Sequence, residues 1–133
     1  MNTTYFLNLV MGNLFGTQTT PAVPTGYYIG LSSTAPTISG TNVTEPATST
    51  GYKRVKLSGM SAPTNGVIKN GSAIQFNEST AAWGTMNYYV VYDAESAGNL
   101  LFYGSLSTSR TIEINTTLVI RANELTLTLS NPS

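Results

Sequence analysis

The first apolar residues of the chain recur three or four positions apart, which is the spacing of one face of a helix. They are Phe6, Leu7, Val10, Met11 and Leu14. The Asn-Thr-Thr stretch at residues 2–4 can cap the start of this helix, and Gly16 can end it. A helix this short is marginal alone in water. We therefore expect its apolar face to pack, either on its own domain or on a neighbouring subunit.

The helical spacing ends at residues 17–26, TQTTPAVPTG. This stretch contains two prolines and no apolar periodicity, so it predicts an extended linker. Residues 27–133 then alternate short runs of β-branched and aromatic residues with polar segments rich in Pro, Gly and Asn. The chain is thus expected to hold an N-terminal helix (1–16), a Pro-containing linker (17–26) and one β-domain (27–133).

The β-domain is expected to contain eight strands. They are residues 27–31, 52–57, 73–76, 86–93, 99–106, 111–115, 117–122 and 125–130. No helical spacing follows residue 16, which excludes a fold of alternating strands and helices. The long polar stretch 32–51 is typical of a functional or mobile loop. The expected fold class is all-β: a single jelly-roll-like β-sandwich of about eight short antiparallel strands, preceded by one short N-terminal amphipathic helix.

The strongest predicted strand, residues 86–93 (MNYYVVYD), carries apolar side chains on both faces. That pattern is typical of a central strand covered on both sides. A tight acidic loop leads from it to residues 99–106, so the two strands should form a hairpin. Trp83 lies just before this hairpin. We interpret Trp83 as a core residue that closes one end of the sandwich, and a sugar-stacking platform is the alternative.

Charge is scarce in this chain. Charged residues make up 9% of it, against the usual quarter or so, and six basic residues balance six acidic ones. Only Lys53, Arg54 and Lys56 lie close together, and neighbours in a strand point to opposite faces. We interpret them as protection of an edge strand in preference to an anion site. Nucleic acid is not an expected partner, because phosphate binding needs clustered Lys and Arg.

The chain contains no Cys and no His. Disulfides, thiolate or imidazole metal ligands and His-based catalysis are therefore excluded. Nothing in the sequence pairs two of the six acidic residues as a glycosidase requires. The loop at residues 93–99, DAESAGN, offers oxygen ligands, but too few for Ca²⁺, so we interpret it as a hairpin turn. No catalytic residue, cofactor or metal is expected.

The apolar start has neither the preceding basic residue nor the small-x-small site of a cleaved signal peptide. No run reaches the ~20 apolar residues that a membrane span needs. We therefore expect a protein that is neither exported by a cleaved signal nor membrane-bound. The Asn-x-Ser/Thr sequons, at Asn2, Asn42, Asn70, Asn77 and Asn115, are then best explained by chance in an Asn- and Thr-rich chain.

Several stretches, in order, resemble a known family. The helix ends in Phe15-Gly16, and the linker leads to YYIGLSSTAPT at residues 27–37. TEPATSTGYKRVKL follows at residues 44–57, then IQFNESTAAWGTMNYYVVYDAESAGNLLFYGSL at residues 74–106, and LTLTLS closes the domain. The matching positions are Glu45, Pro46, Gly51, Tyr52, Arg54, Trp83, Gly84, Asp93, Gly98, Leu100 and Gly104. The chain resembles small virion accessory proteins of tailed bacteriophages, labelled head-fibre, capsid-decoration or tail-fibre proteins. It departs from their pattern at residues 114–125, which lack the expected Gly-Asp turn.

The resemblance implies a structural virion protein: a non-enzymatic accessory module, made in the bacterial cytoplasm, that oligomerises and attaches to the capsid or tail. A homotrimer is favoured by analogy with phage accessory proteins. The apolar helix face is the expected contact with other subunits or virion proteins. A Glu45–Arg54 pair is expected across the long loop, where a surface pair contributes ~0–1 kcal/mol.

The alternative function is a carbohydrate-binding module that contacts a glycan on the host cell surface. Its platform would consist of exposed aromatic residues among Tyr27, Tyr52, Trp83 and Tyr103. The polar loop at residues 32–51 is the other candidate surface for a sugar.

Overall fold

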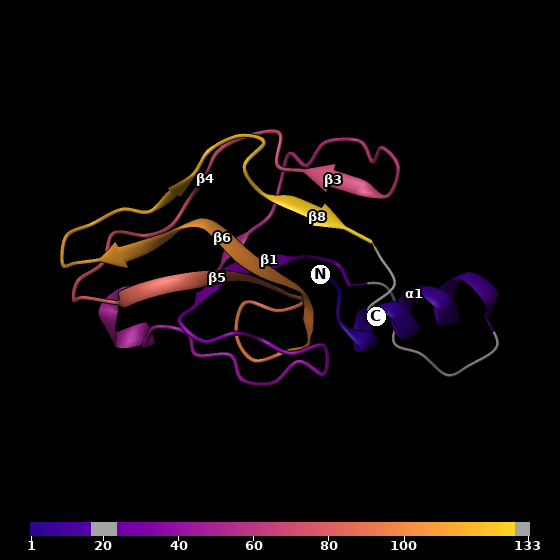
Figure 1. Cartoon of the computed structure of the whole chain (residues 1–133), viewed down its shortest axis with the longest axis horizontal. Coiled ribbons are helices and arrows are strands. Elements are labelled where there is room, and N and C mark those ends of the chain that lie inside the picture. Colours follow the sequence, from indigo (N-terminus) through magenta and orange to yellow (C-terminus); the bar gives the residue numbers. More distant parts are fainter. Residues whose placement is uncertain (17–23, 130–133) are drawn as a thin grey trace.

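The computed structural model describes residues 1–16 and 24–129. Within these ranges the elements are α1 (Thr4–Phe15), β1 (Tyr28–Ser32), a 3₁₀ turn η1 (Thr48–Thr50), β2 (Val55–Lys56), β3 (Val67–Lys69), β4 (Ile74–Gln75), β5 (Gly84–Tyr92), β6 (Leu100–Ile112), β7 (Val119–Ile120) and β8 (Thr126–Thr128). The protein is a small β-sandwich with one N-terminal helix, which confirms the expected fold class (Figure 1).

The ends of α1 follow from its capping residues. The Thr3 hydroxyl accepts a hydrogen bond from the Phe6 N–H at 3.2 Å, so Thr3 is the cap within the predicted stretch. Gly16 adopts a left-handed conformation with φ 64°, and its N–H donates to the Gly12 carbonyl at 2.8 Å. Both predicted boundaries are confirmed.

The main sheet has four antiparallel strands in the order β2-β1-β5-β6. Two smaller antiparallel pairs, β3-β8 and β4-β7, complete the structure of the described chain. Figure 1 shows β3 beside β8. The predicted β5–β6 hairpin is confirmed, with β5 between β1 and β6. Strand β5 is therefore the central strand that its two apolar faces indicated.

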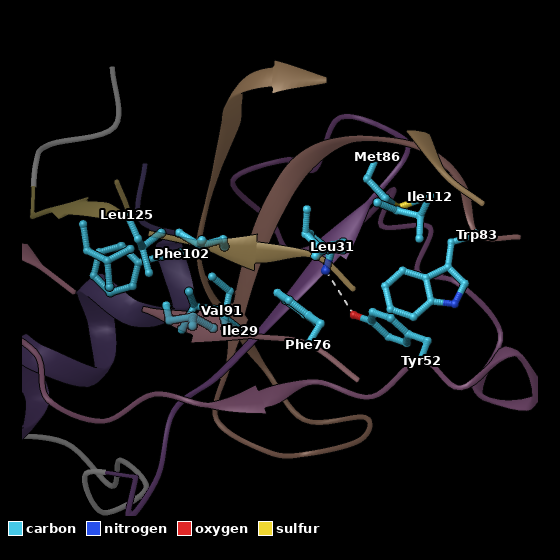
Figure 2. Packing of buried hydrophobic residues seen from close by; sticks show 14 of the residues in the cluster. Ile29, Leu31, Tyr52, Phe76, Trp83, Met86, Val91, Phe102, Ile112 and Leu125 are labelled. Carbon is cyan, nitrogen blue, oxygen red and sulfur yellow. Dashed lines mark hydrogen bonds between the residues drawn. The ribbon is translucent and has the colours of Figure 1, made fainter. Parts of the chain in front are cut away.

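The main core lies between the four-stranded sheet and the smaller pairs (Figure 2). Ile29 and Val91 of the sheet belong to the same buried cluster as Ile120 and Leu127 of the small pairs. The opposite face of β5 is also covered, because Val90 and Tyr92 pack in a second cluster with Leu100 and half-buried Val43. Residue 43 belongs to the long loop, which therefore covers this second face of the sheet.

The structure differs from the sequence prediction in two strands. Two strands were expected at residues 99–106 and 111–115, but residues 100–106 and 111–112 lie in the single strand β6, and residues 113–115 lie in no strand. Within β6, residues 106–109 lie opposite Asn87 alone. This bulge lets one strand continue past a polar Ser-Thr segment. Strand β3 was not predicted. It follows a turn at Asn65-Gly66, where both residues have positive φ, and it exists through pairing with β8.

Most of the predicted linker, residues 17–23, lies outside the described residues, as does residue 130 of the last predicted strand. The polar stretch 33–51 lacks strands but has internal hydrogen bonds. The Thr34 hydroxyl donates to the Asn42 carbonyl at 2.6 Å, and the Asn42 amide donates to the Ala35 carbonyl at 2.8 Å. The Ser33 N–H donates to the Thr44 carbonyl at 3.0 Å. The loop is thus tied to itself as well as to the sheet.

Candidate interaction surface

The first half of α1 packs on its own domain. The Phe6 ring lies 4.6 Å from the Phe102 ring, centroid to centroid, and Tyr5 also contacts the main core. The segment before the helix pairs with strand β6: the Thr3 N–H donates to the Leu101 carbonyl at 2.9 Å, and the Thr3 hydroxyl donates to the Leu100 carbonyl at 2.7 Å. The start of α1 is therefore anchored by backbone pairing and by an aromatic contact.

The second half of α1 is different, because it exposes large apolar side chains. Met11 is 54% exposed, Leu14 is 71% exposed and Phe15 is 67% exposed. These residues lie three and four positions apart and so share one face. No residue of α1 is charged. Figure 1 shows the helix extending to one side of the β-sandwich. We call Met11, Leu14 and Phe15 the exposed helix face.

The five residues expected to form the contact with other subunits differ in their exposure. Phe6 points into the domain, Leu7 and Val10 are half-buried, and Met11 and Leu14 are exposed. Two residues of the helix have roles that its apolar spacing did not predict. Leu9 is buried although it lies off the predicted face, and Phe15 joins the exposed helix face. The spacing of Phe15 from Met11 was a signal for it, because residues four apart are neighbours on a helix.

A buried polar cluster holds the long loop against strand β5 and the hairpin turn. The Arg54 guanidinium donates from Nη2 to Glu45 Oε1 at 2.6 Å and from Nε to Glu45 Oε2 at 3.0 Å. Its Nη1 donates to the carbonyls of Ala94 and Ala97 at 2.9 and 2.8 Å. The guanidinium also lies 3.6 Å from the centre of the Tyr92 ring. Arg54 therefore joins the loop, strand β5 and the hairpin turn.

The expected Glu45–Arg54 pair exists, but it does not lie on the surface. The Arg54 side chain is 7% exposed and the Glu45 side chain 20%. The interpretation of Arg54 as edge protection is therefore wrong, because hairpin residues distant in sequence cover it. Its neighbour Lys53 fits that interpretation, since it is exposed and pairs with exposed Glu95 at 2.6 Å. Lys56 is exposed as well.

Tyr52 completes the buried polar cluster. Its hydroxyl donates to Glu45 Oε2 at 2.5 Å and accepts from the Leu31 N–H at 3.0 Å (Figure 2). Burial, and then the charge of Glu45, raises the pKa of Tyr52 far above its usual range. Burial acts to lower the pKa of Arg54, but the hydrogen bonds and charge of Glu45 outweigh it, so the pKa of Arg54 is raised. Tyr52 therefore stays neutral and Arg54 stays positively charged, so both can donate hydrogen bonds to Glu45.

Trp83 is a core residue, as expected. It is 7% exposed, its ring meets Tyr52 edge to face at 5.4 Å, and its indole N–H donates to the Thr50 carbonyl at 2.9 Å (Figure 2). Burial of Tyr52 and Trp83 corrects the expectation that they belong to an exposed aromatic platform. Tyr27 is half-buried against the main core, and Tyr103 is half-buried against the second cluster, so the four rings do not share one open face.

The acidic loop 93–99 uses its oxygens to close the hairpin. Asp93 accepts hydrogen bonds from the Asn99 backbone N–H at 2.7 Å and from its side-chain amide at 3.0 Å, and Glu95 pairs with Lys53. The turn interpretation accounts for these contacts. Within residues 1–16 and 24–129, no three His, Cys, Asp or Glu side chains gather as a metal site would require. No helix in these ranges has the length and apolar character to cross a membrane.

Comparison with known families identifies the family of this chain. A family model described as podophage GP4 fiber I protein gp80 matches residues 2–128. The chain belongs to this fibre protein family. The match extends from the segment before α1 to the end of β8, so it includes both the exposed helix face and the buried polar cluster. A search of curated proteins finds no match.

Membership of the fibre family confirms the resemblance to phage virion accessory proteins. The chain is a structural fibre protein of a bacteriophage, and its place is in the virion.

Proposed function

We propose that this fibre protein is a non-enzymatic accessory module that forms a homo-oligomer and attaches to another virion protein, on the capsid or tail, through α1. The observation that carries the proposal is the exposed helix face: Met11, Leu14 and Phe15 are all more than half exposed. Apolar side chains grouped on the surface of a helix are typical of protein contacts, because burying them against a partner removes them from water.

The lack of charge on α1 supports a contact between identical copies. Two uncharged apolar faces can meet without repulsion or the desolvation of an unpaired charge. Closed cyclic symmetry is the default for homo-oligomers. We favour a homotrimer by analogy with phage accessory proteins.

The non-enzymatic role is supported by what the acidic side chains do. Glu45 and Glu95 are paired with Arg54 and Lys53, and Asp93 accepts from Asn99. These carboxylates serve structural contacts, and the family is one of structural fibre proteins.

The direct test replaces the exposed helix face by the triple substitution Met11→Gln, Leu14→Gln and Phe15→Gln. Gln is a good helix former, and these side chains are exposed, so the chain should keep its thermal unfolding midpoint. We expect the variant to sediment as a monomer and to be lost from purified particles. The matched control is Ile114→Gln with Leu129→Gln, which removes exposed apolar side chains elsewhere and should change neither result.

This substitution is sharper than deletion of the whole helix. A chain starting at Thr17 would also lose the Phe6–Phe102 contact and the Thr3 hydrogen bonds to β6, so misfolding could imitate a lost contact. If the triple variant keeps the oligomeric state and the particle content of the unmodified chain, the docking role of α1 is wrong.

The alternative, a carbohydrate-binding module, cannot use two of its four predicted aromatic rings, because Tyr52 and Trp83 are buried. The polar loop at residues 32–51 stays the other predicted surface for a sugar.

A further inference from the structure

A second surface differs from the exposed helix face in being polar. An open hollow of about 380 Å³ lies between β2 at the edge of the main sheet and β4 of a small pair. The hollow is lined by Tyr28, Lys56, Gln75 and Asn77, by the Lys53–Glu95 pair, and by Arg54 and Val55. This volume falls in the range of small-ligand sites.

The first notable property of this hollow is that its polar groups have no protein partner. Within residues 1–16 and 24–129, the side chains of Tyr28, Lys56, Gln75 and Asn77 make no hydrogen bond or ion pair. Polar side chains in the loop at residues 33–44, by contrast, bond to one another. The hollow thus gathers a hydroxyl, an ammonium and two amides that a ligand can engage.

The second property is that the backbone positions these groups. Tyr28 and Lys56 are directly opposite in the β1–β2 register, so their side chains share a face of the sheet. A Cβ atom at residue 26 would lie 3.3 Å from both the Tyr28 hydroxyl and Lys56 Cε, so both side chains pass close to the bare backbone of Gly26. Gln75 and Asn77 lie two residues apart, which places both on one side of an extended chain.

The combination fits a sugar better than other ligands. An aromatic ring can stack on the apolar face of a pyranose, and amides can bond its hydroxyls. One unpaired ammonium can bind one carboxylate. A nucleic acid would need several unpaired cations, and a cation would need carboxylates, whereas Glu95 is already paired.

We propose that the hollow between β2 and β4 binds an acidic saccharide, with the carboxylate on Lys56, hydroxyls on Gln75 and Asn77, and the sugar ring against Tyr28. This site is separate from the predicted aromatic platform. It goes beyond the attachment role of α1 and does not rest on it, since the two surfaces share no residue.

The test is calorimetry of the full chain with trigalacturonic acid, and with galactotriose as the neutral counterpart. Lys56→Gln should weaken binding of the acidic sugar by about tenfold, as loss of a charge-assisted hydrogen bond would. The matched control is Lys69→Gln, which removes the same charge from an exposed lysine of β3 outside the hollow and should leave binding unchanged. Gln75→Ala should weaken binding as well.

Three results would overturn the proposal: no heat with the acidic sugar at millimolar concentration, equal binding of the neutral sugar, or equal loss in Lys56→Gln and Lys69→Gln. None of these results tests the proposed role of the exposed helix face, because its triple variant is measured by sedimentation and by its content in particles.

Discussion

The helix α1 differs in regularity and in packing from the stretch at residues 33–54, which consists of the long loop and the residues that lead from it to β2. The helix is a regular, well-capped element, yet its second half leaves Leu14 71% exposed. This stretch holds one short 3₁₀ turn, yet its Arg54 guanidinium makes four hydrogen bonds and its Val43 packs against one face of β5. A segment of this protein is therefore held in place by hydrogen-bonded polar groups and buried apolar groups, whether or not its backbone is regular.

The largest expected effect comes from breaking the loop's buried cluster. Arg54→Met removes one partner of a buried pair and leaves Glu45 without its cation, which should lower the free energy of unfolding by about 3–5 kcal/mol. Urea denaturation measures this value. Lys53→Met is the matched control, because it removes an exposed pair in the neighbouring residue and should leave stability nearly unchanged. Equal effects of the two changes would contradict the distinction between these pairs.

Gly30→Ala should disturb the buried polar cluster, because Gly30 of β1 lies directly against it. A Cβ atom there would lie 2.9 Å from Glu45 Oε2 and closer still to the Tyr52 hydroxyl, so the cluster must shift. We expect a loss of about 1–3 kcal/mol in the free energy of unfolding, as for overpacking. The cost should be smaller in a Tyr52→Phe background, where the nearest atom is gone. Additive costs of the two substitutions would show that the hydroxyl is not the obstacle.

Two phenylalanines allow the packed first half of α1 to be compared with its exposed second half. Phe6→Ala removes a ring that packs on Phe102 and should cost about 1–2 kcal/mol, with faster hydrogen exchange along α1. Phe15→Ala makes the same change in a 67% exposed ring and should alter stability by less than about 0.5 kcal/mol. If hydrogen exchange along α1 is faster in Phe15→Ala than in Phe6→Ala, the conclusion that the first half of α1 packs on the domain is wrong.

The smallest effect concerns alkaline pH. Because the pKa of Tyr52 is raised in the folded state, the unfolded chain releases this proton first. The associated stability is fully present below about pH 10 and is lost as the pH rises further. Tyr52→Phe should reduce the decline above about pH 10 by up to ~1.4 kcal/mol per pH unit. Urea titrations on both sides of that pH measure the slope, and an unchanged slope would remove Tyr52 as its source.

A residual slope is expected in the Tyr52→Phe variant. Burial also raises the pKa values of Tyr89, Tyr92 and Tyr103, so these groups lose protons on unfolding in the same pH range.

Much of this fold could be predicted from local patterns. The helix boundaries follow from Thr3 and Gly16, and the β5–β6 hairpin follows from two apolar runs around a polar turn. Strand β3 could not be predicted, because its three residues have no pattern of their own and depend on pairing with β8, more than fifty positions later. The position of Trp83 in the core was predicted, whereas the burial of Tyr52 beside it was not.

The exposed helix face shows the same division. Helical periodicity placed Met11 and Leu14 on an apolar face, and both are exposed. Periodicity cannot show which part of a face is covered by the protein itself. Phe6 was therefore predicted to contact other subunits, although it packs on Phe102. The polar hollow carries no local signal, since Lys56 and Gln75 come together through two different sheets.

The sequence by itself determined the fold class, the capped helix, the hairpin and the resemblance to phage virion proteins, because caps, turns and alternation act between near neighbours. Tertiary structure decided which pairs are buried. Arg54 and Lys53 are adjacent and each binds a glutamate at 2.6 Å, but only Arg54 lies beneath the hairpin turn and over Tyr92. The environment of a charge depends on segments brought together by folding, and no local pattern encodes it.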